Sequence, residues 1–226
     1  MKKILTIFAL ATVLTAGAFA KSSGSDFAIG FMDGALATAV DGGNDVISTT
    51  GLNIAGFKAD ATFGIKNGFG LQLDTTFAFP VGKGTYEVKN KDKTEKDDIT
   101  VDDGFAMNLL FGPAYTFYFG EKMQLTLGLG FDVLYNSRKI TVEMAGPLGT
   151  TLKTSQTASG WDFGVGTTVD FAFLFNKKVG LKAGLTTAVT GGKKQDVKVN
   201  DNTTETVDAD NCSVAIIPDI SFIVRF

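Results

Sequence analysis

Residues 55–79 read AGFKADATFGIKNGFGLQLDTTFAF, and this stretch decides the fold. From Ala55 to Ile65 every second residue is apolar, and the residues between them are glycine, threonine or charged. A period of two predicts a β-strand with one apolar and one polar face. Asn67-Gly68 then favours a hairpin, because both central positions of a type I′ turn need a positive φ. Alternation resumes from Phe69 to Phe79, so the stretch predicts two antiparallel strands.

The same alternation recurs along the chain. It predicts six further strands, at residues 27–40, 105–119, 123–135, 161–175, 179–189 and 213–226. In the first of these, Asp33 would interrupt the apolar face. We therefore expect a β-bulge near Met32 to Gly34, after which Leu36 and Val40 join that face. Pro113 and Pro218 lie inside predicted strands, where a missing N–H favours a bulge or a strand end.

The first twenty residues have the pattern of a secretory signal peptide. Lys2 and Lys3 precede an apolar run that is too short to span a membrane as a helix. Ala18-Phe19-Ala20 supplies the small residues that a signal peptidase requires, so we expect cleavage after Ala20. The expected organisation is a signal peptide at 1–20 and one domain at 21–226, exported to an envelope compartment.

The composition excludes several kinds of chemistry. The chain has no histidine, which removes Ser-His-Asp hydrolysis and histidine-bound zinc. A net charge of −3 gives no basic surface for nucleic acid. Gly128-x-Gly130 lacks the third glycine of a nucleotide-binding loop, and the acidic residues at 201–210 do not have the spacing of an EF-hand. We expect no enzyme, no cofactor and no metal site.

Alternation alone leaves two kinds of closed barrel, because the apolar face can point inward, as in a lipocalin-like protein, or outward to lipid. Short turns alternate with connections of ten or more residues, as in membrane barrels. The opposite face is rich in Gly, Asp, Lys, Gln and Asn, which suit a narrow polar lumen. We expect two outward aromatic girdles that flank the turns and the long connections: Phe63, Phe69, Phe105, Phe117, Phe119, Tyr135, Trp161, Phe173 and Phe175.

Charged residues on the polar face should meet inside the barrel. The predicted lumen charges are Lys58, Asp60, Asp74, Asp132, Asp162, Asp170, Lys182, Asp219 and Arg225. Position along the strands places Asp170, Lys182 and Asp219 in one group and Lys58, Asp60 and Asp74 in another. One interpretation is a salt-bridge network that plugs the lumen, since eight strands leave an interior that side chains can fill. The other is a gated path for ions or small solutes, which Leu110, Leu134, Leu174 and Ile217 would narrow.

The last residues are Phe222-Ile223-Val224-Arg225-Phe226, with Phe222, Val224 and Phe226 on one face. This end resembles the signal that the outer-membrane assembly machinery reads. The mature chain thereby resembles the small eight-stranded outer-membrane barrels of Gram-negative-type bacteria, such as OmpX, OmpW and the transmembrane domain of OmpA. The resemblance implies an outer-membrane location, with assembly machinery and membrane lipid as partners.

The fold predicted from these features is all-β: a closed, eight-stranded, antiparallel up-and-down transmembrane β-barrel, monomeric in the membrane. The charged segments Val81 to Asp103 and Gly191 to Asn211 would be extracellular loops, where a rigid scaffold places recognition. We expect a surface structural or interaction protein, adhesin-like, with a largely plugged lumen and an extracellular ligand. The alternative is an OmpW-like channel or conduit for small, hydrophobic solutes.

Overall fold

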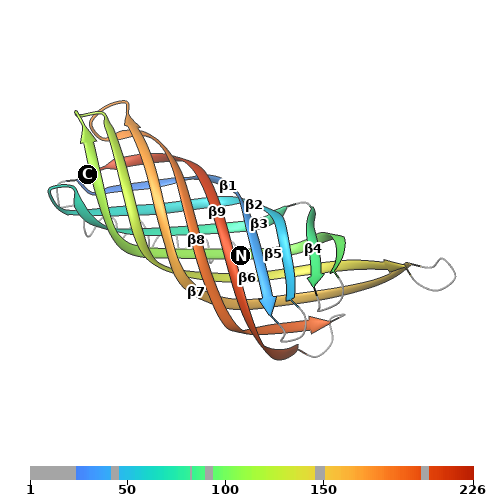
Figure 1. Ribbon diagram of the computed structural model, residues 1–226. Helices are drawn as coiled ribbons and strands as arrows, with labels where there is room; N and C mark the ends of the chain where they lie inside the picture. The colour runs from blue at the N-terminus through green and yellow to red at the C-terminus, as the bar shows by residue number, and fades with distance from the viewer. Residues whose placement is uncertain (1–23, 42–45, 82, 90–93, 146–150, 200–203) are drawn as a thin grey trace.

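The computed structural model describes residues 24–41, 46–81, 83–89, 94–145, 151–199 and 204–226. Within these ranges the chain forms eight long strands and one short strand (Figure 1). The long strands are β1 (Asp26–Asp41), β2 (Val46–Lys66), β3 (Phe69–Val81), β5 (Thr94–Phe119), β6 (Met123–Ala145), β7 (Thr151–Leu174), β8 (Val179–Val199) and β9 (Thr204–Arg225). The short strand is β4 (Lys83–Lys89). No helix in the described part of the chain is long and apolar enough to cross a membrane.

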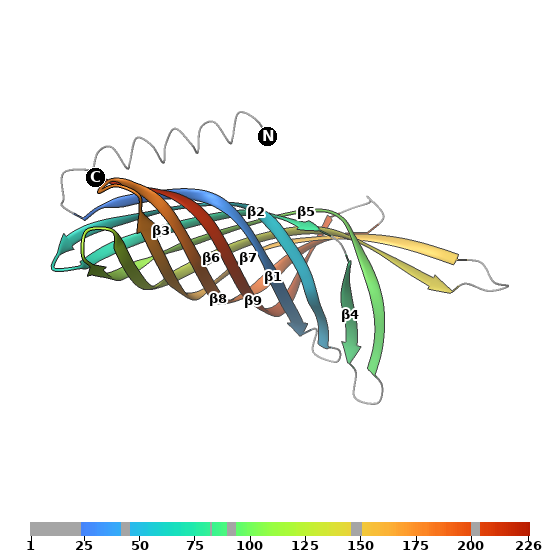
Figure 2. The same ribbon diagram turned by 90° about the horizontal axis from the view of Figure 1, so that it is seen from above.

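The eight long strands close into a barrel. Each pairs antiparallel with its sequence neighbour among the eight, and β1 pairs with both β2 and β9, so every long strand is bonded on two sides. One circuit of paired residues runs through Ala37, Val214, Val189, Val165, Phe131, Phe111, Leu73, Ala61 and Phe27. The circuit starts at Ala37 of β1 and returns to the same strand at Phe27, ten residues away. Because of this stagger the strands are tilted relative to the barrel axis, as Figure 2 shows.

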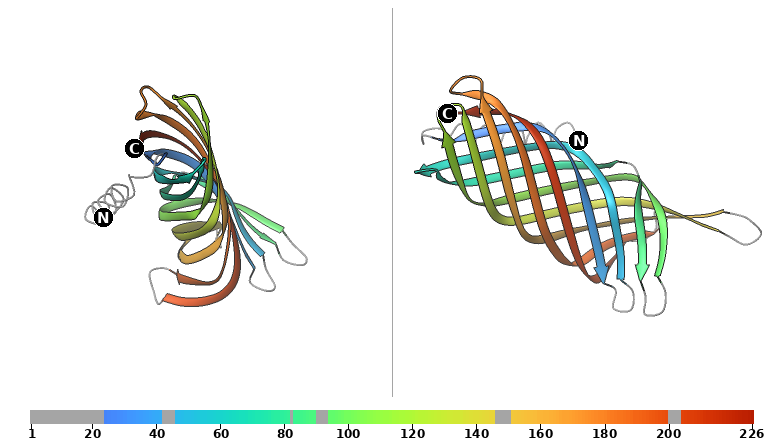
Figure 3. Two further views of the ribbon diagram at one scale, coloured as in Figure 1. Left: turned by 90° about the vertical axis from the view of Figure 1, so that its left-hand side faces the viewer. Right: turned by 45° about the horizontal axis from the view of Figure 1, so that its top comes forward.

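One end of the barrel carries the short turns, and we call it the short-turn end. Between β2 and β3 the predicted type I′ hairpin is present, since Asn67 has φ 53° and Gly68 has φ 84°. The turns from β5 to β6 and from β7 to β8 lie at the same end, as do the start of β1 and the end of β9 (Figure 3).

The opposite end, which we call the hairpin end, differs from the expected loops. There the strands continue well past the predicted boundaries, so that residues 136–145 and 151–160, for example, form a paired extension of β6 and β7. Strand β4 pairs with β2 and with β5, and takes the place beside β5 that β3 leaves when it ends at Val81. Within the expected loop Val81 to Asp103, the segment Thr85 to Val88 pairs with Glu95 to Asp98 and forms a hairpin. Backbone pairing therefore extends the wall where the charged sequence suggested loops.

The two faces of the wall differ as the alternation predicts. Outward side chains between the ends are apolar and exposed, among them Phe31, Leu129, Val165 and Ile220. Inward side chains are buried and largely polar, and they fill the lumen. In this closed barrel the apolar face is the outer surface.

The expected bulge near Met32 to Gly34 is wrong. Met32 and Leu36 are both buried in the lumen, and Asp33 is exposed on the outer face. The register shift in this strand comes later, between Leu36 and Thr38 in the pairing with β2. The expectation failed because it assumed that Leu36 had to face outward, whereas the lumen has an apolar layer of its own. The side chain of Val40 lies outside the described residues.

The expectation that Pro113 and Pro218 mark a bulge or a strand end is wrong. Pro113 pairs with Leu71 of β3, and the ladder to β6 has a gap between Phe111 and Ala114 without a change of register. Pro218 pairs with Leu185 of β8, and the ladder from β9 to β1 has a similar gap. Each proline therefore interrupts the backbone pairing with one neighbouring strand only.

Candidate functional site: the filled lumen

The centre of the lumen is built around Lys58, a fully buried lysine on β2. Its Nζ lies 2.7 Å from Asp219 Oδ1 of β9 and 3.0 Å from Asp74 Oδ2 of β3. It also donates to Thr186 Oγ1 of β8 at 2.8 Å, and Asp170 Oδ1 of β7 lies 4.0 Å away. One ammonium group thus contacts four other strands. A buried charge of this kind is tolerated only when it is paired and hydrogen-bonded.

Lys182 of β8 is the second buried cation. It donates to Asp60 Oδ2 of β2, and its Nζ lies 3.5 Å from Asp170 Oδ2. Because Asp170 approaches both lysines, the two groups expected from the sequence form a single network, which we call the ion network. The ion network consists of Lys58, Asp60, Asp74, Asp170, Lys182 and Asp219.

Hydroxyl groups supply further donors to the ion network. Thr186 Oγ1 donates to Asp74 Oδ2 at 3.2 Å, and Ser221 Oγ donates to Asp219 Oδ2 at 2.7 Å. The ion network has more carboxylates than lysines, and two ammonium groups cannot donate to every carboxylate oxygen. The neutral hydroxyl groups supply some of the missing hydrogen bonds.

Gly184 of β8 makes the close approach of two carboxylates possible. A Cβ at this position would lie 2.3 Å from Asp219 Oδ1 and 2.4 Å from Asp170 Oδ1. A side chain there would displace one or both carboxylates from Lys58. Part of the high glycine content therefore has a steric reason inside the lumen.

Three predicted lumen charges lie outside the ion network. Asp132 is fully buried and accepts a 2.8 Å hydrogen bond from Asn108 Nδ2. Asp162 is buried nearer the hairpin end, where it accepts hydrogen bonds from Asn211 and Ser213 of β9. Arg225 is half-buried at the short-turn end, donates to Gln124 Oε1 and stacks over the ring of Tyr118 at 5.3 Å. The structure therefore brings six of the nine predicted charges together.

Apolar layers lie on both sides of the ion network. The layer towards the hairpin end is the larger, and its big side chains are Met32, Leu36, Ile54, Leu134 and Ile217. The layer towards the short-turn end consists of Ala28, Ala172, Leu174 and Ile223. A cavity beside the larger layer has a volume of about 10 Å³, which is no more than one water molecule occupies. Leu110, Leu134, Leu174 and Ile217 are buried in the lumen as predicted, whereas Met32, Leu36 and Ile54 were not predicted to lie there.

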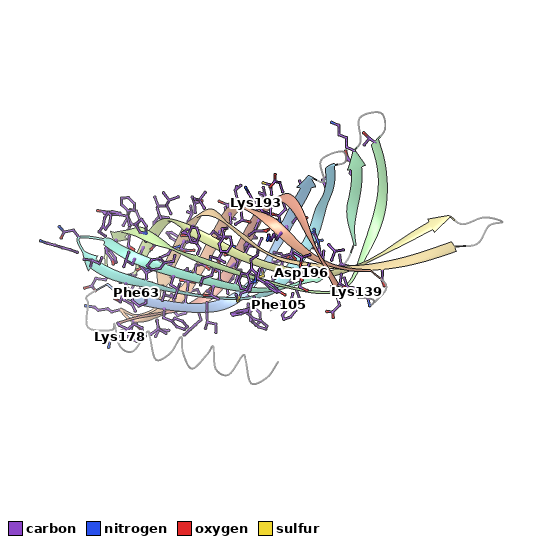
Figure 4. All side chains as sticks on the ribbon, turned by 90° about the horizontal axis from the view of Figure 1, so that it is seen from below. Phe63, Phe105, Lys139, Lys178, Lys193 and Asp196 are labelled. Atoms are coloured by element: carbon purple, nitrogen blue, oxygen red, sulfur yellow. The ribbon has the colours of Figure 1, made fainter. Side chains whose placement is uncertain are left out.

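The predicted girdle residues lie on the outer surface. Towards the hairpin end Phe105, Tyr135 and Trp161 form a row across three strands, with centroid distances of 6.4 and 4.9 Å. Towards the short-turn end Phe173 and Phe175 are edge to face at 6.2 Å. Phe69, Phe117 and Phe119 are exposed at that end, and Phe63 is half-exposed there. Figure 4 places Phe63 near the short-turn end and Phe105 nearer the hairpin end.

The other predicted residues are placed as follows. Phe222 is exposed on the outer face of β9, Val224 is half-exposed there, and Phe226 is exposed directly after the end of the strand. Ala18 and Ala20 of the expected cleavage site lie outside the described residues, as does Asp201. In the described ranges no group of three or more Cys, Asp or Glu side chains has a metal-binding arrangement.

The fold resembles solved outer-membrane proteins. The outer membrane protein OprG from Pseudomonas aeruginosa aligns with a TM-score of 0.57 at 11% identity, over 92% of this chain and 98% of that one. The outer membrane protease OmpT from Escherichia coli aligns with a TM-score of 0.51 at 11% identity, over 90% and 96%. At these identities the likeness concerns the fold alone. No curated protein sequence matches the chain.

A family model matches most of the sequence. Residues 19–216 fit the model described as "Domain of unknown function (DUF2715)", which covers all the long strands except the end of β9. The closed barrel and filled lumen described above are thus those of one member of this family. The chain belongs to the DUF2715 family.

Proposed function

We propose that this protein is an integral outer-membrane β-barrel that serves as a surface scaffold, adhesin-like, and not as an enzyme or an open pore. Its exposed apolar surface between two aromatic rows supports insertion into a bilayer. Closure supports the same conclusion, since an open strand edge in lipid would leave N–H and C=O groups unsatisfied. Cleavage after Ala20 would release the exported domain.

The proposed orientation places the short-turn end in the periplasm and the hairpin end outside the cell. Membrane barrels of bacteria have short periplasmic turns and longer extracellular connections. The C-terminal segment with Phe222, Val224 and Phe226 would then lie on the periplasmic side, within reach of the assembly machinery.

The filled lumen is the observation that carries the scaffold proposal. Lys58 and Lys182 tie together carboxylates from β2, β3, β7 and β9, and apolar layers flank them on both sides. A solute or ion would have to break buried ion pairs and displace Leu36, Leu134 or Ile217 in order to pass. The arrangement supports a barrel whose interior holds the wall in shape.

Planar-bilayer recording tests the plug. We expect wild-type protein to give no reproducible conductance steps, while a general porin reconstituted in the same lipid does. Stable, uniform single-channel steps from the wild type would overturn the scaffold proposal and favour the conduit.

Shortening the hairpins tests the surface role. Residues 84–99 and 195–207 would each be replaced by Asn-Gly, which joins the strands at paired positions. We expect cells that display the wild type to bind extracellular-matrix proteins or lipopolysaccharide, and cells that display these variants to lose that binding. The matched control replaces residues 142–154 of the β6–β7 extension in the same way. Wild-type binding that survives both deletions would contradict recognition through these segments.

A further inference from the structure

The three turns of the short-turn end all carry lysine. Lys66 is the last residue of β2, Lys122 directly precedes β6, and the pair Lys177 and Lys178 directly precedes β8. All four side chains are exposed, and Figure 4 places Lys178 at the same end as Phe63. The turns are spaced around the barrel, because they join β2 to β3, β5 to β6 and β7 to β8. We call these four residues the lysine ring.

Acidic groups are fewer than lysines at this end. Glu121 is the one exposed acidic side chain among the described residues of the turns, and Lys177 pairs with it at 2.9 Å. The carboxylate of Phe226 is a second anion, while Asp26 is buried in the lumen. Residues 1–23 lie outside the described ranges, but they contain neither Asp nor Glu. Within the described residues, the other three lysines of the ring have no carboxylate within 4.0 Å.

The apolar outer surface reaches the lysine ring directly. Ile65, which precedes Lys66, is 67% exposed, and Phe69, which pairs with Lys66, is 54% exposed. Phe175 lies two residues before Lys177 and is also exposed. The ammonium groups therefore lie where the apolar surface ends, which in a bilayer is the level of the headgroups. A lysine there keeps its alkyl chain along apolar surface and its charge among polar groups.

The charges of the hairpin end are arranged differently. There the wall continues beyond the aromatic row of Phe105, Tyr135 and Trp161, for example through residues 136–145 of β6. The segment 193–210 of that end carries side chains of both signs. Its charges are mixed and lie beyond the apolar surface, whereas the lysine ring is positive and adjoins that surface.

We propose that the lysine ring binds the headgroups of anionic phospholipids in the leaflet at the short-turn end. The inference rests on the proposed insertion into a bilayer, but it does not depend on which leaflet that end faces. In a zwitterionic lipid the cationic headgroup compensates the phosphate, whereas in phosphatidylglycerol the phosphate charge is uncompensated. Each lysine near an anionic membrane surface is attracted to it, so the ring enriches anionic lipid around the barrel.

Electron paramagnetic resonance of spin-labelled lipids measures this preference. The protein without residues 1–20 would be refolded into phosphatidylcholine vesicles that contain a trace of labelled phosphatidylglycerol or labelled phosphatidylcholine. At low ionic strength we expect the barrel to associate about two- to fivefold more strongly with phosphatidylglycerol, the range of an exposed ion pair. In about 1 M sodium chloride the two lipids should associate equally, because screening then acts within about 3 Å.

Two variants that lose the same charge locate the preference. The test variant loses the three ring lysines without an ion pair: Lys66→Gln, Lys122→Gln and Lys178→Gln. The matched control loses three exposed lysines of the hairpin end: Lys89→Gln, Lys193→Gln and Lys194→Gln. We expect the test variant to associate with both lipids alike and the control to keep the preference of the wild type.

The outcomes separate this inference from the proposed function. An inserted wild-type barrel that associates equally with both lipids at low ionic strength would overturn the inference alone. A test variant that keeps the preference, or a control that loses it, would do the same. A barrel that immobilises neither lipid has not inserted, which would contradict the proposed function as well. If the test variant does not fold, the wild type decides, because a preference that persists in high salt would refute binding by exposed lysines.

Discussion

Lys58 of β2 and Asp219 of β9 meet inside the barrel across β1, with 2.7 Å between Nζ and Oδ1. Replacing Lys58 with methionine keeps most of its volume and removes the charge that Asp219 and Asp74 share. Because buried carboxylates would then lose their partner, we expect Lys58→Met to lower the free energy of unfolding by about 3–5 kcal/mol. Urea titration in lipid vesicles, followed by the fluorescence of Trp161, measures this change.

The control for that variant is Lys177→Met at the short-turn end. Lys177 lies 2.9 Å from Glu121, but both side chains are more than 70% exposed. An exposed pair contributes little, so we expect a change within about 0.5 kcal/mol. Equal effects of the two lysine variants would refute a stabilising role for the ion network.

Gly184→Ala tests the steric role of a lumen glycine. A Cβ would fall within 2.4 Å of carboxylate oxygens of both Asp170 and Asp219. We expect a loss of about 1–3 kcal/mol, the usual cost of added atoms in a packed interior. Ala183→Val adds more volume on the exposed outer face of the same strand and should be nearly neutral. A neutral Gly184→Ala would mean that the carboxylates move aside at no cost.

Gly68→Ala tests the β2–β3 hairpin. Gly68 has φ 84°, and a Cβ there would also lie 2.4 Å from the carbonyl oxygen of Thr116. We expect a loss of about 1–2 kcal/mol, because a non-glycine residue is strained in the left-handed region. Asn67→Gly keeps the turn type and should change stability by a few tenths of a kcal/mol at most. The hypothesis fails if both variants unfold at the same urea concentration.

Asp33 is exposed on the outer face, between Phe31 and Ala35. It pairs with Ala55, which in turn pairs with Phe79, so it lies within the apolar surface and not at the rim. A carboxylate that faces lipid is unfavourable, and we expect Asp33→Ala to raise the free energy of unfolding in a bilayer by about 1–2 kcal/mol. Asp210→Ala, at the exposed hairpin end, should have no such effect. Destabilisation by Asp33→Ala would indicate that this carboxylate has a partner in the membrane.

The fold follows from the sequence because a period of two and the Asn67-Gly68 turn are local signals. Those signals locate all eight long strands and assign Lys58, Asp74 and Asp219 to the lumen. They do not locate the hairpin end, because backbone pairing can extend strands whose side chains are polar on both faces. This is why β5 begins at Thr94 and not at the predicted Phe105.

The apolar layer in the lumen was the harder feature to predict. Leu36 and Ile54 belong to strands whose outer faces are also apolar, so hydrophobicity does not distinguish the two sides. The register does so, but it is fixed by pairing between strands, which for β1 includes pairing with the distant β9.

The contacts of Lys58 also have a consequence for the order of assembly. Its bond to Asp219 joins residues 161 positions apart, and the bond from Lys182 to Asp60 spans 122. A barrel that grew strand by strand would keep Lys58 beside Asp74 and Lys182 beside Asp170, but the bonds to Asp219 and Asp60 would be missing until β9 docked against β1. Part of the compensation arrives only in the final step, so partly closed intermediates should be sparse and folding should be cooperative.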